Sequence, residues 1–169
     1  MNTVTSLACR DSGAIGNLSD RRQQEDALIA EALNILRRRT YRASYERASS
    51  PVEVKRHLML SYGESEKEHF GLIWLDVKNR ILKREVLCTG TLTHCSVYPR
   101  EIVKSGLSVN AASCILFHNH PSGEKDPSEA DRRLTTAIQQ ALTLVEMRVL
   151  DHIIVAGAET YSFAENGDL

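Results

Sequence analysis

Four side chains that can bind a metal or move a proton lie close together in the second half of the chain. His118 and His120 are separated by one residue, and Ser128 and Asp131 follow in the spacing H-x-H-x7-S-x2-D. Histidines at positions i and i+2 of an extended backbone project to the same side of it. Two imidazoles and one carboxylate leave the fourth position of a tetrahedral zinc site open for water, as in catalytic zinc sites. The spacing therefore predicts a metal site formed by His118, His120 and Asp131.

Each part of this pattern also has a purely structural interpretation. A histidine pair in a loop is commonly solvated or hydrogen-bonded, and the segment from Ser128 to Asp131 is an acceptable helix-capping sequence, with Asp where Glu or Gln is usual. The combination favours a metal site, because both histidines, Ser128 and Asp131 fall together where a strand, a loop and a helix meet.

The elements that must position these residues follow from the hydrophobic pattern. Short apolar runs predict buried strands, and apolar residues at helical spacing predict helices. The predicted strands cover residues 70–75, 81–91, 111–117, 151–156 and 160–163, with a hairpin turn at 76–80 and a loop at 118–127. The predicted helices cover residues 27–36, 52–60, 99–107 and 134–145. This alternation predicts an α/β (α+β-like) fold, a mixed β-sheet flanked by helices.

The N-terminal part differs in composition from the rest of the chain. Residues 1 to about 22 lack apolar periodicity and are rich in Ser, Gly, Asn and Asp, which is typical of a tail. We therefore expect residues 1–49 to form a flexible tail and a helical N-terminal extension, and residues 50–169 to form the domain that carries the site.

Composition excludes some classes of partner. Asp and Glu number 22 against 21 Lys and Arg, so the formal net charge is -1. A protein that binds nucleic acid by neutralising phosphates usually has a basic excess. No apolar run has the roughly 18 residues that a membrane helix needs, and the polar N-terminus has no signal-peptide core. The composition thus favours a cytoplasmic protein.

The four cysteines, Cys9, Cys88, Cys95 and Cys114, form no CxxC pair. We expect reduced, mostly buried thiols rather than a zinc site made of cysteines, because the spacing that zinc ligands require is missing.

The segment His118-Asn119-His120-Pro121-Ser122-Gly123, together with Ser128 and Asp131, resembles the JAMM (JAB or MPN) metalloproteases, and within them the RadC-like proteins. The segments Tyr98–Ile102 and Asp151–Val155 also match, and the resemblance extends from about Ser50 to the C-terminus. It implies a JAMM/MPN-like fold with one zinc ion per chain, held by the two histidines and Asp131, and hydrolysis of a peptide or isopeptide bond. Longer RadC proteins carry a helix-hairpin-helix-type segment before this domain, and the first fifty or so residues here show no clear signature of one.

The resemblance also implies a glutamate as general base. Glu68 directly precedes the first apolar strand, where the family places its base, and Glu85 lies in the return strand. We prefer Glu68 and keep Glu85 as the alternative. Ser128 resembles the family serine that hydrogen-bonds the water or the tetrahedral oxyanion. His152 precedes an apolar strand and is expected to be structural or to support a ligand.

Three functions are consistent with this sequence. The first is a zinc metallopeptidase that acts on a protein or peptide substrate. The second is a protein that acts on or binds DNA, because RadC-like proteins carry a DNA-repair label, although the charge does not support nucleic-acid binding. The third is a catalytically inactive scaffold, which is the weakest of the three because all ligand positions are present.

Overall fold

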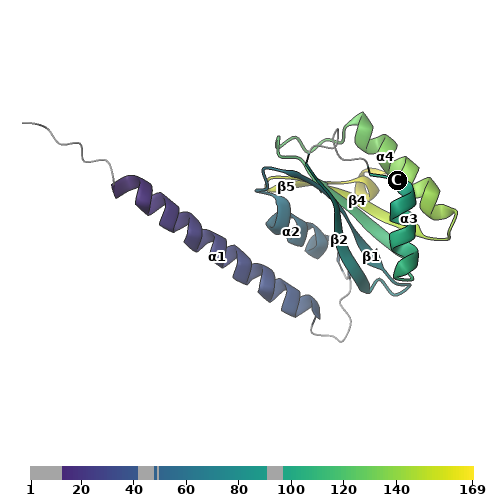
Figure 1. Cartoon of the computed structure of the whole chain (residues 1–169), viewed down its shortest axis with the longest axis horizontal. Helices are drawn as coiled ribbons and strands as arrows, with labels where there is room; N and C mark the ends of the chain where they lie inside the picture. The colour runs from purple at the N-terminus through teal and green to yellow at the C-terminus, as the bar shows by residue number, and fades with distance from the viewer. Residues whose placement is uncertain (1–12, 42–47, 49, 91–96) are drawn as a thin grey trace, which may run out of the picture.

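Five strands form one mixed sheet in a computed structural model of the chain. The structure describes residues 13–41, 48, 50–90 and 97–169, and it describes side chains for residues 20–36, 48, 50–90 and 97–169. The sheet order is β2-β1-β3-β4-β5 (Figure 1). β3 and β4 are parallel, and the other neighbouring pairs are antiparallel. The strands are β1 (Glu68–Leu75), β2 (Ile81–Gly90), β3 (Ser113–Asn119), β4 (Arg148–Ala156) and β5 (Glu159–Ser162). The prediction of a mixed sheet flanked by helices is confirmed.

Helices cover both faces of this sheet (Figure 1). Helix α2 (Pro51–Tyr62) packs on one face, and α3 (Pro99–Ser108) and α4 (Glu129–Thr143) pack on the other. A short helix, α5 (Phe163–Asn166), follows β5 and was not predicted from the sequence. At four residues it is too short to show a helical period in the hydrophobic pattern.

Strand β1 divides the core between the two faces. Phe70, Leu72 and Trp74 belong to the cluster that contacts α3 and α4, whereas Ile73 and Leu75 belong to the cluster that contacts α2. Successive side chains of a strand point to opposite faces of its sheet. A strand buried on both faces is therefore a continuous apolar run, which is why the segment from residue 70 to 75 shows no alternation of polar and apolar residues.

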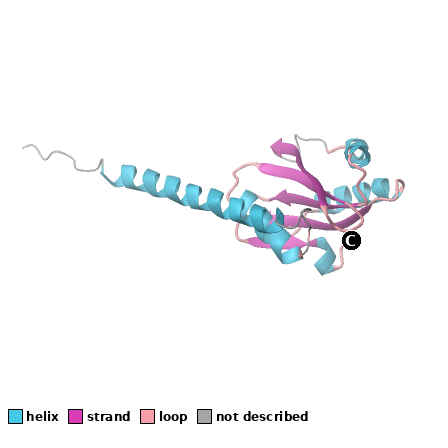
Figure 2. Cartoon of the chain, turned by 90° about the horizontal axis from the view of Figure 1, so that it is seen from below, coloured by secondary structure: helices cyan, strands magenta, loops and turns pink. Residues whose placement is uncertain are grey.

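Helix α1 (Gly13–Tyr41) contacts α2 and projects away from the sheet (Figure 2). The N-terminal helical extension was predicted, but its start was not, because residues 13–22 were assigned to the tail. Apolar periodicity detects the side of a helix that packs against a core. A helix that extends into solvent lacks that signal. The remainder of the predicted tail, residues 1–12, lies outside the described residues.

The chain brings the C-terminal ends of β3 and β4 together with the N-terminus of α4. Parallel neighbours end at the same edge of a sheet, and such edges are where open α/β sheets bind ligands. β3 ends at Asn119, two residues later than predicted, so His118 lies within the strand rather than in the loop after it. The loop from His120 to Ser128 then returns the chain to α4.

The cysteines differ in part from the prediction. Cys114 is a free, buried thiol, as expected, and burial raises its pKa to about 12. Cys88 is disulfide-bonded, so the prediction of a reduced thiol is wrong there. Disulfide formation depends on the distance between two Cα atoms in the fold, which the absence of a CxxC spacing does not exclude. Cys9 and Cys95 lie outside the described residues.

Within the part of the chain that the structure describes, no helix is both long and apolar enough to span a bilayer.

Candidate metal centre

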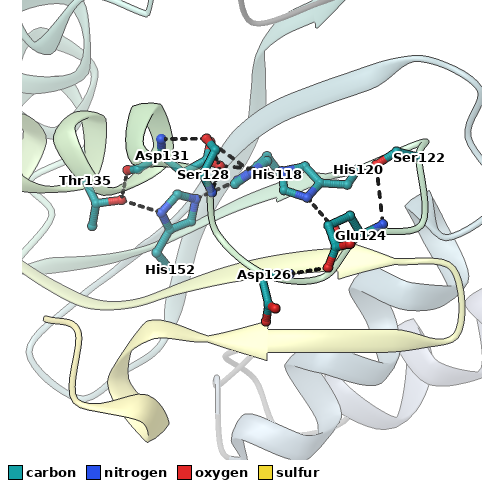
Figure 3. Close-up of polar contacts among 9 residues, drawn as sticks. All are labelled: His118, His120, Ser122, Glu124, Asp126, Ser128, Asp131, Thr135 and His152. Atoms are coloured by element: carbon teal, nitrogen blue, oxygen red, sulfur yellow. Dashed lines mark hydrogen bonds and ion pairs between the residues drawn. The ribbon is translucent and has the colours of Figure 1, made fainter.

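The two histidines meet at the end of β3. His118 is fully buried and His120 is the first residue after the strand, and their Nε2 atoms lie 2.9 Å apart (Figure 3). The backbone N–H of His120 donates to the carbonyl of Val155 on β4, which holds this residue in line with the strand. The i, i+2 spacing therefore places both imidazoles on one side of the backbone, as predicted from the sequence.

Asp131 reaches the histidines from the first turn of α4. Its Oδ1 lies 3.3 Å from His118 Nε2, and its Oδ2 lies 3.6 Å from His120 Nε2. The carboxylate is 1% exposed. Burial alone would raise the pKa of Asp131, but the nearby rings of His118 and His120 and the hydrogen bond from Ser128 outweigh burial and hold that pKa well below its usual range. Asp131 is therefore an anion at neutral pH.

Ser128 is the N-cap of α4 and orients this carboxylate. Its backbone N–H and its hydroxyl both donate to Asp131 Oδ2, at 2.8 and 2.5 Å, and its Oγ accepts from the Asp131 backbone N–H in a capping box. The helix-capping interpretation of this segment is thus correct, and it coexists with the site. Because the hydroxyl proton is used on Oδ2, the geometry favours an orienting role for Ser128. Its predicted hydrogen bond to a water or an oxyanion stays a prediction.

The other carboxylate oxygen of Asp131 is left without a partner. Oδ1 is buried and has no hydrogen-bond partner among the described residues. A buried polar atom without a partner costs about 1–3 kcal/mol, so native structures rarely leave one unsatisfied. This orphaned oxygen lies 3.3 Å from His118 Nε2, and the other oxygen of the same carboxylate lies 3.6 Å from His120 Nε2, so a further group fits between the carboxylate and the two rings.

A chain of hydrogen bonds fixes the tautomer of His118. The Thr135 hydroxyl donates to the backbone carbonyl of Asp131 (2.6 Å), so its oxygen accepts from His152 Nδ1 (2.6 Å). His152 is fully buried, which lowers its pKa well below 6.5 and keeps its ring neutral. Its Nε2 therefore accepts from His118 Nδ1 (2.8 Å). The proton of His118 therefore sits on Nδ1, and its Nε2 is directed toward Asp131 (Figure 3).

The same logic applies to His120. Its Nδ1 lies 2.6 Å from the backbone carbonyl of Glu124, which can only accept, so Nδ1 carries the proton. Two bare Nε2 lone pairs and one anionic oxygen thus converge. A cation between them would stabilise all three acceptors.

The size of this triangle fits zinc. Metal–ligand distances of 2.0–2.2 Å in a tetrahedron place neighbouring ligand atoms about 3.3–3.6 Å apart. The two Nε2 atoms are 2.9 Å apart, His118 Nε2 is 3.3 Å from Asp131 Oδ1 and His120 Nε2 is 3.6 Å from Asp131 Oδ2, so the two nitrogen–oxygen separations lie in this range and the nitrogen–nitrogen separation is shorter. Two imidazoles and a carboxylate are also a donor set that zinc accepts. The residues present therefore fit the metal ion that the sequence implied.

Glu68 approaches from the opposite strand. It is the first residue of β1, it is half-buried, and its carboxylate lies within 4.8 Å of a ligand nitrogen of both His118 and His120. Glu68 can therefore either complete a ligand set with the histidines or act on a water beside them. The structure brings together the predicted base and the predicted ligands.

Glu85, the alternative base, lies elsewhere. Its carboxylate accepts from Trp74 Nε1 (2.6 Å) and from the hydroxyl of Ser105, and it pairs with Lys83. Burial raises its pKa, but the bonds from Lys83, Ser105 and Trp74 outweigh burial and lower it. Glu85 is thus a structural carboxylate between β2 and α3.

Acidic residues border the centre. The segments 64–69 and 120–129, which carry Glu68 and the loop after His120, contain six acidic and two basic side chains. Lys125, one of the two basic residues, is paired with Glu159 at 3.2 Å. The charges around the site are therefore unfavourable for a polyanion.

Two residues of this site were not predicted from the sequence. Thr135 lies one helical turn after Asp131, and Asn119 lies between the histidines. Thr135 could have been predicted, because residues four positions apart lie on the same face of a helix and Asp131 is a predicted ligand.

Comparison with known proteins identifies the family and relatives of this chain. The family described as RadC-like JAB domain matches residues 48–168. A UPF0758 protein of Janthinobacterium sp. (strain Marseille) is 57% identical over 121 residues, which are 72% of this chain and 54% of that protein. The UPF0758 protein YkfG of Escherichia coli (strain K12) is 44% identical over 144 residues, covering 85% of this chain and 90% of that protein. The chain spans about half the length of the first relatives it matches.

Proposed function

This chain belongs to the RadC-like JAB domain family, and we propose that it is a zinc-dependent hydrolase of peptide or isopeptide bonds. The observation that carries the proposal is the buried Oδ1 of Asp131, which has no hydrogen-bond partner among the described residues and lies beside the Nε2 atoms that His118 and His120 direct at the same carboxylate. In this proposal the three residues hold one zinc ion. A zinc ion in such a site lowers the pKa of its bound water from 15.7 to about 7 and polarises a substrate carbonyl.

Asp131 is the better third ligand, and Glu68 the better base. Asp131 is buried, anionic and oriented by Ser128, whereas Glu68 is half-exposed and arrives from a different strand. A general base must reach both the attacking water and the leaving group, so it needs an open side. Glu68 takes the proton from the attacking water and passes it to the leaving amine.

The remaining residues hold these groups in place. Ser128 fixes the carboxylate of Asp131 through Oδ2 and leaves Oδ1 for the metal. His152 and Thr135 keep the proton of His118 on Nδ1, so that Nε2 stays available as a ligand. Partners of this kind typically affect metal affinity by about 10–100-fold.

The charge around the site supports an amide rather than a DNA substrate. The acidic segments on both sides of the histidines repel a phosphate backbone and tolerate a neutral or cationic peptide. The DNA-directed alternative predicts binding that weakens steeply with salt. We expect instead a flat response when duplex and single-stranded DNA binding is titrated between low and high salt.

The test compares Glu68→Gln with Glu85→Gln. Each variant replaces one carboxylate by an amide, Glu68 on β1 and Glu85 on β2, so they are matched in chemistry. The probes are a pooled library of internally quenched peptides and a second pool whose members are joined through lysine side chains. We expect zinc-loaded wild type to cleave one pool, and Glu68→Gln to lose about 10²- to 10⁴-fold in rate with its zinc retained. Glu85→Gln should keep the wild-type rate within about threefold.

Intact turnover in Glu68→Gln would show that the base is another group. Failure of zinc-loaded wild type to cleave either pool would contradict the hydrolase for these two bond types.

A further inference from the structure

Asn119 lies between the two histidines of the metal centre, and its side chain contacts a different strand. It is 2% exposed. Its Oδ1 accepts from the backbone N–H of His69 at 2.8 Å, and its Nδ2 donates to the backbone carbonyl of Lys67 at 3.0 Å, with the carbonyl of Ser65 at 3.5 Å. One buried amide therefore connects the strand that carries the histidines with the segment that carries Glu68.

These two bonds bracket Glu68. The carbonyl of Lys67 belongs to the peptide unit before Glu68, and the N–H of His69 belongs to the peptide unit after it. Fixing both units fixes the direction in which the Glu68 side chain leaves the backbone. We propose that Asn119 is a positioning residue that sets the place of Glu68 relative to the histidine pair.

The sheet itself does not provide this link at that end. The ladder between β1 and β3 has Phe70 opposite His118 as its last pair, and Glu68 is paired with Gly90 of β2. The backbone of Asn119 is paired with Val155 of β4. Beyond Phe70, the connection from β1 to β3 therefore runs through the side chain of Asn119.

Local bonds hold the Glu68 segment in shape without tying it to β3. The Ser65 hydroxyl donates to the carbonyl of Lys67 at 2.9 Å, accepts from the N–H of Lys67 at 3.3 Å and lies 2.9 Å from His69 Nε2. Ser65→Ala is therefore a matched control, because it loosens the same segment and leaves both side-chain bonds of Asn119 in place.

The role needs an amide. The side chain of Asn donates and accepts at once, as Lys67 and His69 require. Asn119→Asp keeps an acceptor for His69 but sets an anionic oxygen against the carbonyl of Lys67. Asn119→Leu has a similar volume and removes both bonds. Since misplacing a catalytic group by about 1 Å can cost about 10²-fold in rate, the loss of both bonds should be large.

The first measurement is independent of any activity. Amide hydrogen exchange at His69, followed by NMR in the zinc-loaded protein, should be about 5- to 10-fold faster in Asn119→Leu, because that amide loses its acceptor. Asn119→Asp and Ser65→Ala should stay near the wild-type rate, and all three variants should retain stoichiometric zinc. Unchanged exchange at His69 in Asn119→Leu would overturn the proposal, whatever the protein hydrolyses.

The second measurement separates positioning from general structural damage, and it rests on the proposed function. On the peptide pool that wild type cleaves, Asn119→Leu should lower kcat about 10- to 100-fold with KM within about threefold. In the Glu68→Gln background the same substitution should cost less than about twofold, because Asn119 acts through Glu68. An equal loss in both backgrounds would contradict the proposal.

If wild type cleaves neither pool, the proposed function fails, while the exchange rate at His69 still decides the role of Asn119.

Discussion

Two carboxylates, the buried Asp131 and the half-buried Glu85, lie beside the same sheet and differ in how their oxygens are hydrogen-bonded. Glu85, between β2 and α3, meets an indole N–H, a hydroxyl and an ammonium. Asp131, at the start of α4, has one oxygen held by Ser128 and the other left unpartnered among the described residues. Both have a lowered pKa. A shifted pKa therefore does not distinguish the two sites, whereas the unpartnered oxygen does.

The neighbours of each carboxylate lead to the same distinction. The partners of Glu85 are donors, so the region is complete without any added group. The atoms that face the Asp131 carboxylate are ring nitrogens of His118 and His120, and the protons of these rings are held on the far side by His152 and by the carbonyl of Glu124. A shared cation would stabilise such a cluster of acceptors, which is why we propose a metal site here and not at Glu85.

The largest expected effect is at Asp131. Asp131→Ala should weaken zinc binding by about 10³-fold or more, because it removes one of three protein ligands and the only charged one. Competition with a chromogenic chelator measures the affinity. Zinc affinity equal to wild type would show that Glu68, and not Asp131, completes the ligand set.

A smaller effect on zinc affinity is expected at His152, which contacts the predicted ligand His118. His152→Phe removes the acceptor that holds the proton on His118 Nδ1, and zinc affinity should fall by about 10–100-fold. In Thr135→Val, which keeps His152 and removes only the hydroxyl bonded to it, zinc affinity should fall by less. The same chelator competition ranks the two variants, and the reverse order would contradict the hydrogen-bond chain.

The smallest effect on zinc is expected at Glu85. Glu85→Gln should leave zinc affinity within about twofold and lower the free energy of unfolding by about 1–3 kcal/mol, because hydrogen bonds to a charged group are lost. Denaturant unfolding measures the second quantity. A weakened zinc site in this variant would break the comparison between the two carboxylates.

The Glu85 contribution has a defined pH dependence. Its folded pKa lies below the model-peptide value of 4.5, so the stabilisation is complete above pH 4.5 and is lost as pH falls through the lower folded pKa. The difference in unfolding free energy between wild type and Glu85→Gln should therefore narrow in acid. A difference that grew on acidification would contradict this assignment.

The sequence predicted the parts of the site that depend on local spacing. His118 and His120 share one side of a strand, and Ser128 and Asp131 share one helix turn, so both pairs are visible as short motifs. Glu68, preferred over Glu85 from the sequence, lies near the two histidines because it begins the strand that pairs with β3, and its role as the base stays a prediction. The predicted strands match for the same reason, since the apolar runs that define them are continuous.

Contacts between residues far apart in the chain could not be predicted from the sequence. The bond from His118 to His152 joins residues on parallel strands 34 positions apart, and the bond from Asn119 to Lys67 spans 52 positions. No local pattern encodes such pairs. The start of α1 was missed because a helix that projects into solvent has little apolar periodicity, and the disulfide of Cys88 was missed because it depends on the fold.

The central claim is that a metal ion occupies the space between His118, His120 and Asp131. The most direct test is anomalous diffraction at the zinc edge, on crystals of wild-type protein purified with zinc present. We predict one anomalous peak per chain, about 2.0–2.2 Å from Nε2 of each histidine and from Asp131 Oδ1. A map without a peak there, with Asp131 Oδ1 hydrogen-bonded to a protein group instead, would contradict the claim.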